Sequence, residues 1–125
     1  MSTRTTFFVA TTGVALTMDF PAGLLDKPTV ESKNITPDMV GDLDFLLTGS
    51  RTREPVCLRE EEHLVVFRLD DELVSAIAEL GDRQIPEVAD EWGIYDAPGT
   101  IALLNELRAL AQTANARDEQ MFFYF

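Results

Sequence analysis

The run Met121-Phe122-Phe123-Tyr124-Phe125 places five apolar side chains in succession after a polar turn at residues 117–119. An unbroken apolar run of this length is typical of a buried strand, and it would promote aggregation unless paired inside a sheet. The stretch Thr5–Thr12 (TTFFVATT) has the β-branched and aromatic content of a second buried strand. We therefore expect these two segments to pair, with the later one near the centre of the sheet.

Apolar residues at helical spacing predict helices in the middle of the chain. The expected helices cover about residues 37–48, 71–80, 86–92 and 98–116. Thr36 and Asp70 are suited to cap two of them, and Gly49 is suited to end the first. Residues 64–69 (LVVFRL) predict another strand or buried connector, and residues 50–55 predict a polar loop. Residues 13–37 are expected to be irregular, with room for one short helix.

These elements predict a single α+β domain over residues 1–125. A small sheet would include the N- and C-terminal strands, with three or four helices packed mainly on one face. A chain of 125 residues with 46% hydrophobic content can form a core without disulfides, and one cysteine cannot form an internal disulfide.

The charge is strongly negative: 22 acidic residues against 10 basic ones give a net charge of −12. Most of the excess lies after residue 40. Such a surface repels nucleic acids and anionic membranes, and it attracts basic proteins by raising the association rate. Solubility alone is an equally good explanation of the acidity. The charge therefore predicts a basic protein as partner and no nucleic acid or membrane.

The N-terminal segment has a weak similarity to a secretory signal. Arg4 precedes the apolar stretch 7–16, but threonines interrupt that stretch and no small-x-small cleavage site precedes Asp19. No run approaches the ~18 apolar residues of a membrane span. We expect a cytoplasmic protein.

Groups suited to catalysis or metal binding are scarce. Cys57 and His63 are six residues apart, which on a continuous strand is roughly 20 Å, too far for a proton-transfer pair unless the chain folds back. The carboxylate runs at 60–62, 70–72 and 90–91 lack the alternating oxygen ligands around a glycine that a calcium loop needs. They are typical of a solvated surface. No nucleophile-elbow, zincin, phosphate-loop or dinucleotide motif occurs. The sequence predicts no catalytic residue, metal or cofactor, and favours a binding protein over an enzyme.

The segment 84–99 is the candidate partner-binding site, because it combines aromatic residues with carboxylates. The predicted site residues are Glu87, Asp90, Glu91, Trp92, Tyr95 and Asp96. Aromatic side chains supply buried contact area and acids steer a basic partner. The alternative is that Trp92 belongs to the core and Tyr95 packs in a turn.

Three segments resemble the YfbM-like family of small bacterial proteins of unknown function. Residues 43–50 (LDFLLTGS) are similar to its x-L-L-T-G helix end, residues 68–73 to its acid-capped middle helix, and residues 106–112 with the last strand to its C-terminal elements. The N-terminal part departs from the family, which opens with a short strand and a helix. The resemblance implies an α+β domain and no activity.

Three functions remain open. The first is a bacterial immunity or antitoxin-like inhibitor that covers a basic toxin. The second is a small ligand-binding domain or enzyme with a pocket between sheet and helices, using Arg51, Arg53 or His63. The third is a subunit whose apolar terminal strands pair with a second copy.

Overall fold

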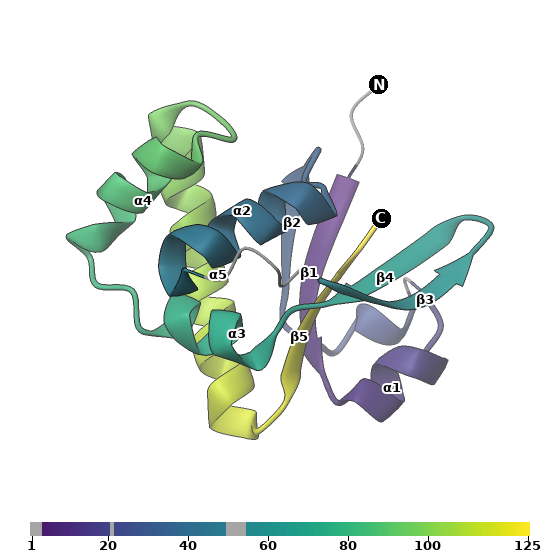
Figure 1. The fold of residues 1–125 in the computed structure, drawn as a ribbon. Coiled ribbons are helices and arrows are strands. Elements are labelled where there is room, and N and C mark those ends of the chain that lie inside the picture. The colour runs from purple at the N-terminus through teal and green to yellow at the C-terminus, as the bar shows by residue number, and fades with distance from the viewer. Residues whose placement is uncertain (1–3, 21, 50–54) are drawn as a thin grey trace.

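The structure, a computed structural model, describes residues 4–20, 22–49 and 55–125. Figure 1 shows the elements along the chain. They are β1 (Arg4–Ala10), α1 (Thr12–Thr17), the 3-10 helix η1 (Ala22–Leu24), β2 (Thr29–Lys33), α2 (Pro37–Thr48), β3 (Val56–Glu61), β4 (Leu64–Arg68), α3 (Asp71–Ala78), α4 (Gln84–Trp92), α5 (Ala97–Arg117) and β5 (Gln120–Tyr124).

The five strands form one antiparallel sheet in the order β2-β1-β5-β4-β3. β5 therefore lies at the centre, with β1 on one side and β4 on the other, as Figure 1 shows. The pairing of the N- and C-terminal strands is confirmed. Its physical reason is that successive aromatic residues in β5 point to opposite faces of the sheet, so they need a packing layer on each face, and a central strand is covered best by both layers.

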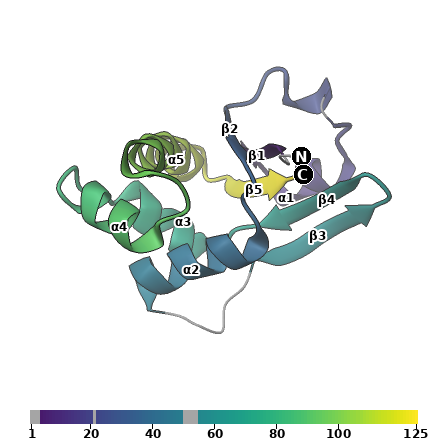
Figure 2. The ribbon, with the colours of Figure 1, turned by 90° about the horizontal axis from the view of Figure 1, so that it is seen from above.

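Alternate residues of β1 and β5 supply two separate cores. On one face Phe123 stacks against Phe67 and lies beside Phe7, with ring centroids 5.2 and 5.4 Å apart. On the other face Phe8 stacks on Phe122 at 5.3 Å. The larger core joins the first face to α2, α3, α4 and α5, and Figure 2 shows these helices gathered on that side of the sheet. The predicted α+β class and the placement of the helices are confirmed.

Helix ends follow the expected signals. The Thr36 side chain accepts a hydrogen bond from the Met39 N–H at the start of α2, and Gly49 ends the helix with φ +79°. Asp70 caps α3 in the same way, accepting from the Glu72 N–H. α4 begins two residues before the predicted position, and α5 runs from Ala97 to Arg117, one residue longer at each end than expected.

Two parts of the sheet depart from the sequence prediction. Residues 13–37, expected to be irregular, contain α1, η1 and the edge strand β2. Val30 is the one buried residue of β2, so this strand has almost no hydrophobic signal. Glu60 and Glu61, expected in a solvated loop, belong to β3, although both side chains are exposed. Most of the predicted loop 50–55, with Arg51 and Arg53, lies outside the described residues.

The second core is smaller and is covered by α1 and η1. Its buried members include Phe8, Phe122, Ala15 and Leu24. No helix in the described ranges combines the length and apolar character that crossing a bilayer requires.

Candidate functional site

Three carboxylates share the outer face of α4. Glu87, Asp90 and Glu91 are all exposed, and their spacing of three and four residues places them on one side of the helix. The opposite side carries the buried residues Ile85 and Ala89. Within the described part of the chain, none of the three carboxylates lies within 4.0 Å of a cationic side chain. We call these three residues the α4 acidic face.

Trp92 lies under this face, because its side chain points into the larger core. The residue is 8% exposed, and the indole N–H donates a 2.8 Å hydrogen bond to the Met39 carbonyl in α2. A buried indole with its N–H satisfied fixes one helix against another. In this structure Trp92 therefore holds α4 in place and exposes little area for a partner.

Tyr95 and Asp96 also bond within the fold. The Tyr95 hydroxyl contacts the Ser32 hydroxyl, accepts a hydrogen bond from the Lys33 N–H at 3.1 Å and donates to the Lys33 carbonyl. Asp96 is exposed, and its carboxylate accepts from the Gly99 N–H at 2.9 Å, capping α5. The six predicted residues thus divide into three exposed carboxylates and three residues that fix the neighbouring elements.

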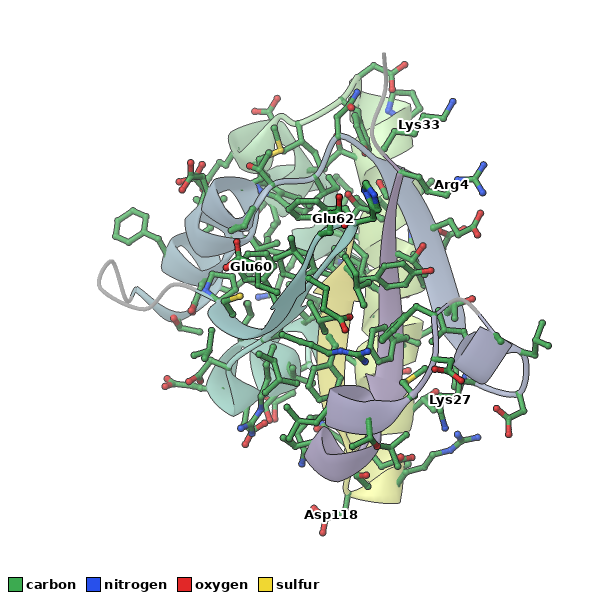
Figure 3. The ribbon with its side chains drawn as sticks, turned by 90° about the vertical axis from the view of Figure 1, so that its right-hand side faces the viewer. Arg4, Lys27, Lys33, Glu60, Glu62 and Asp118 are labelled. Atoms are coloured by element: carbon green, nitrogen blue, oxygen red, sulfur yellow. The ribbon has the colours of Figure 1, made fainter. Side chains whose placement is uncertain are left out.

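A second acidic-aromatic surface lies under the β3–β4 hairpin. A groove of about 810 Å³ separates this hairpin from the segment that follows α1. It is lined by Asp19, Phe20, Arg59, Glu61, Glu62, His63, Leu64 and Tyr124. We call it the hairpin groove. Figure 3 shows Glu60 and Glu62 on the hairpin above it.

Arg59 holds the two walls of the hairpin groove together. Its guanidinium donates to the carbonyls of Met18 (2.8 Å) and Ala15 (3.4 Å), pairs with Glu61 at 3.1 Å, and lies 5.4 Å from the centre of the Phe20 ring. The side chain is 19% exposed. A planar fork with several donors suits this arrangement better than an ammonium group does. Arg59 is therefore a structural cation whose charge Glu61 balances.

Replacing Arg59 with methionine is expected to lower the free energy of unfolding by about 1.5–3 kcal/mol, the range for hydrogen bonds made by a charged group. Arg59→Lys should recover only part of the loss. Urea denaturation measures both, with Arg83→Met at an exposed helix cap as the control. Equal stability of the methionine variants at 59 and 83 would contradict the assigned role.

Cys57 lies near the start of β3, and His63 lies in the hairpin turn at residues 62–63, at the other end of that strand. The chain does not fold back between them, so the estimate for an extended strand still applies. The His63 side chain is 90% exposed and its Nε2 lies 3.8 Å from a Glu62 oxygen. In the described ranges no three histidine, cysteine, aspartate or glutamate side chains are grouped to hold a metal ion.

Comparison with known proteins gives no assignment: no protein-family model, curated protein or solved structure matches the chain. The resemblance to the YfbM-like family stays a prediction.

The hairpin groove was not predictable from the sequence. Phe20 falls in a segment expected to be irregular, and Tyr124 was assigned only to a buried strand. The two rings lie 4.7 Å apart in the fold, although more than a hundred residues separate them along the chain. The available signal was an aromatic residue next to Asp19 in a mainly apolar stretch, residues 14–25 (VALTMDFPAGLL), and such a residue is more often part of a core.

Proposed function

We propose that this chain is an acidic binding domain for a basic protein, and that it acts as an immunity or antitoxin-like inhibitor in a bacterial cytoplasm. The observation that carries the proposal is the α4 acidic face: three exposed carboxylates, unpaired among the described residues, on one rigidly held helix. Fixed like charges on a protein of net charge −12 accelerate association with a cationic surface.

In this proposal the six predicted residues have two roles. Glu87, Asp90 and Glu91 contact the partner. Trp92, Tyr95 and Asp96 position them, since their hydrogen bonds join α4 and the following loop to α2, β2 and α5. Preorganised charges lose little conformational freedom on binding, which favours affinity.

Reversing the α4 acidic face tests the proposal. The variant Glu87→Lys/Asp90→Lys/Glu91→Lys is expected to weaken partner binding about 10- to 100-fold at low salt, because it removes electrostatic steering. The partner is first captured from source-organism lysate on the N-terminally tagged chain at low and high salt and identified by mass spectrometry. Binding of the purified partner is then measured for each variant.

The matched control carries the same change in net charge elsewhere. Asp19→Lys/Glu60→Lys/Glu62→Lys alters the hairpin surface and leaves α4 intact. Unchanged affinity of the α4 variant would refute the assigned face, and loss of binding only in the control would move the contact to the hairpin. Protection of cells that express the captured protein would support the inhibitor role.

The hairpin groove supports the alternative function, a small-ligand site or enzyme. It contains His63 and two aromatic rings, but it lies on the sheet face covered by α1 rather than between the sheet and the larger helices. We propose that a ligand of this groove is small and cationic, to match Asp19, Glu61 and Glu62. Ligand screening by NMR, with His63 ring shifts as the readout, tests this alternative.

A further inference from the structure

We propose that the outer edge of β2, together with α5 beside it, forms a docking groove for an extended basic segment of a partner protein. The segment would add to the sheet as a new strand next to β2. This groove shares no residue with the α4 acidic face, so each proposal can be tested independently of the other.

The hydrogen-bond pattern of the sheet shows which way each backbone group points. Val65 and Phe125 exchange two hydrogen bonds, of 3.1 and 3.2 Å, so the N–H and C=O of Phe125 point toward β4. In an antiparallel ladder this direction alternates along each strand. Phe123 therefore also points toward β4, and Phe7, its partner in β1, points away from β5 toward β2. Val30, opposite Phe7, points back toward β1.

The neighbours of Val30 in β2 consequently point outward. The N–H and C=O groups of Thr29 and Glu31 face away from β1, and within the described residues they make no hydrogen bond. Lys33 confirms the alternation, because its N–H and C=O both meet the Tyr95 hydroxyl on the outer side of the strand. Tyr95 thus covers one end of the edge and leaves Thr29 and Glu31 open.

A groove runs along this open part of the edge. Its volume is about 490 Å³. It is lined by Pro28, Thr29, Val30 and Glu31 on one side and by Glu106, Ala109, Leu110 and Thr113 of α5 on the other. The edge strand can supply backbone hydrogen bonds to an added strand. The groove beside the helix can take alternate side chains of that strand. At the other edge, β3, a register shift between Cys57 and Arg59 interrupts the row.

The net charge of −12 and the residues that line the groove favour a basic occupant. The charged lining residues, Glu31 and Glu106, are both acidic: Glu106 lies on the α5 wall, and Glu31 lies on the edge strand with its side chain on the sheet face opposite α5, since its neighbour Val30 packs into the core beside α5. Arg4 lies 4.0 Å from Glu31, but both side chains are more than 60% exposed and can exchange partners. Figure 3 shows Arg4 and Lys33 near one end of β2 and Lys27 near the other. A second copy fits poorly, because it would bring two chains of charge −12 together.

The test uses a labelled synthetic peptide that alternates lysine with valine and threonine. Its binding is measured by fluorescence anisotropy, and the amide exchange of Thr29 and Glu31 is followed by NMR. A second peptide of equal charge carries proline in place of valine and threonine, so it cannot form a strand. We expect binding of the first peptide only, with slower exchange at Thr29 and Glu31.

Variants of the groove make the test specific. Glu31→Pro removes an outward N–H, and Glu31→Gln keeps it. We expect the proline variant to bind about tenfold more weakly than the glutamine variant, the factor for one lost hydrogen bond. Ala109→Trp fills the groove from α5 and should abolish binding, whereas Ala102→Trp, two turns away on an exposed position, should not.

Several results would overturn the docking groove. They are equal affinity of the two peptides, equal affinity of the wild type and Ala109→Trp, or no binding at millimolar peptide. Thermal unfolding of each variant verifies that it is folded. If Glu31→Pro does not fold, the two tryptophan variants decide the question. The triple lysine variant of α4 should bind this peptide no more than a few times more weakly, through the change in net charge.

Discussion

Phe123→Ala is expected to lower the free energy of unfolding by about 3–5 kcal/mol, the usual cost of removing a buried phenylalanine. The Phe123 side chain is fully buried on the central strand. Its ring packs between Phe7 and Phe67, 5.4 and 5.2 Å away, and lies 6.5 Å from Phe125. Neighbouring strands fix the backbone on both sides, so the cavity cannot collapse easily.

Equilibrium urea denaturation followed by far-UV circular dichroism measures this loss. Leu25→Ala is the matched control, because Leu25 is 91% exposed and its truncation should change stability by less than about 0.5 kcal/mol. A loss below about 1 kcal/mol for Phe123→Ala would contradict a central position of β5, since an edge strand relaxes more readily.

The second large effect concerns Trp92. Trp92→Ala is expected to cost about 3–5 kcal/mol, because it removes a large buried side chain and its hydrogen bond to Met39. Trp92→Phe keeps most of the apolar volume but removes the indole hydrogen bond to the Met39 carbonyl, so about 0.5–1.5 kcal/mol should be lost. Glu91→Ala, the exposed neighbour, is the control for stability.

The same variants separate the two possible roles of Trp92. If Trp92 positions the α4 acidic face, Trp92→Phe should change partner affinity by less than about threefold at a temperature where it is folded, below the tenfold that 1.4 kcal/mol represents. If Trp92 is itself a hot-spot anchor, the affinity should fall by about tenfold or more even though the protein remains folded. Stopped-flow association and equilibrium binding with the captured partner measure both quantities.

The elements with strong local signals were predictable. β1 and β5 each concentrate apolar residues in one short stretch, and α2 has both a capping threonine and a terminal glycine, so pattern and end signals agree. Where local propensity and position in the fold agree in this way, the secondary structure of a segment can be predicted from its sequence. The pairing of β1 with β5 was predicted because an unbroken apolar run promotes aggregation unless it is paired inside a sheet.

What remained hidden depends on neighbours distant in the chain. β2 has one buried residue, so only its pairing with β1 makes it a strand. β3 ends in two glutamates, Glu60 and Glu61, which are typical of a loop. They are part of a strand because they pair with Val65 and Leu64 of β4. For the candidate site, the carboxylates of α4 were predicted because acidic residues surround Trp92 and Tyr95 in segment 84–99. The burial of Trp92 depends on its contact with α2, which no local pattern contains.

The central position of β5 bears on how the protein is made. β1 leaves the ribosome before the other four strands of the sheet, yet its partner on the inner side comes from residues 120–124. β4 cannot join β1 before that strand arrives, because β5 lies between them. Until then the aromatic residues of β1 and β4 lack their main cover. We therefore expect the sheet to form only after synthesis of residue 124, and the nascent chain to depend on chaperones during that interval.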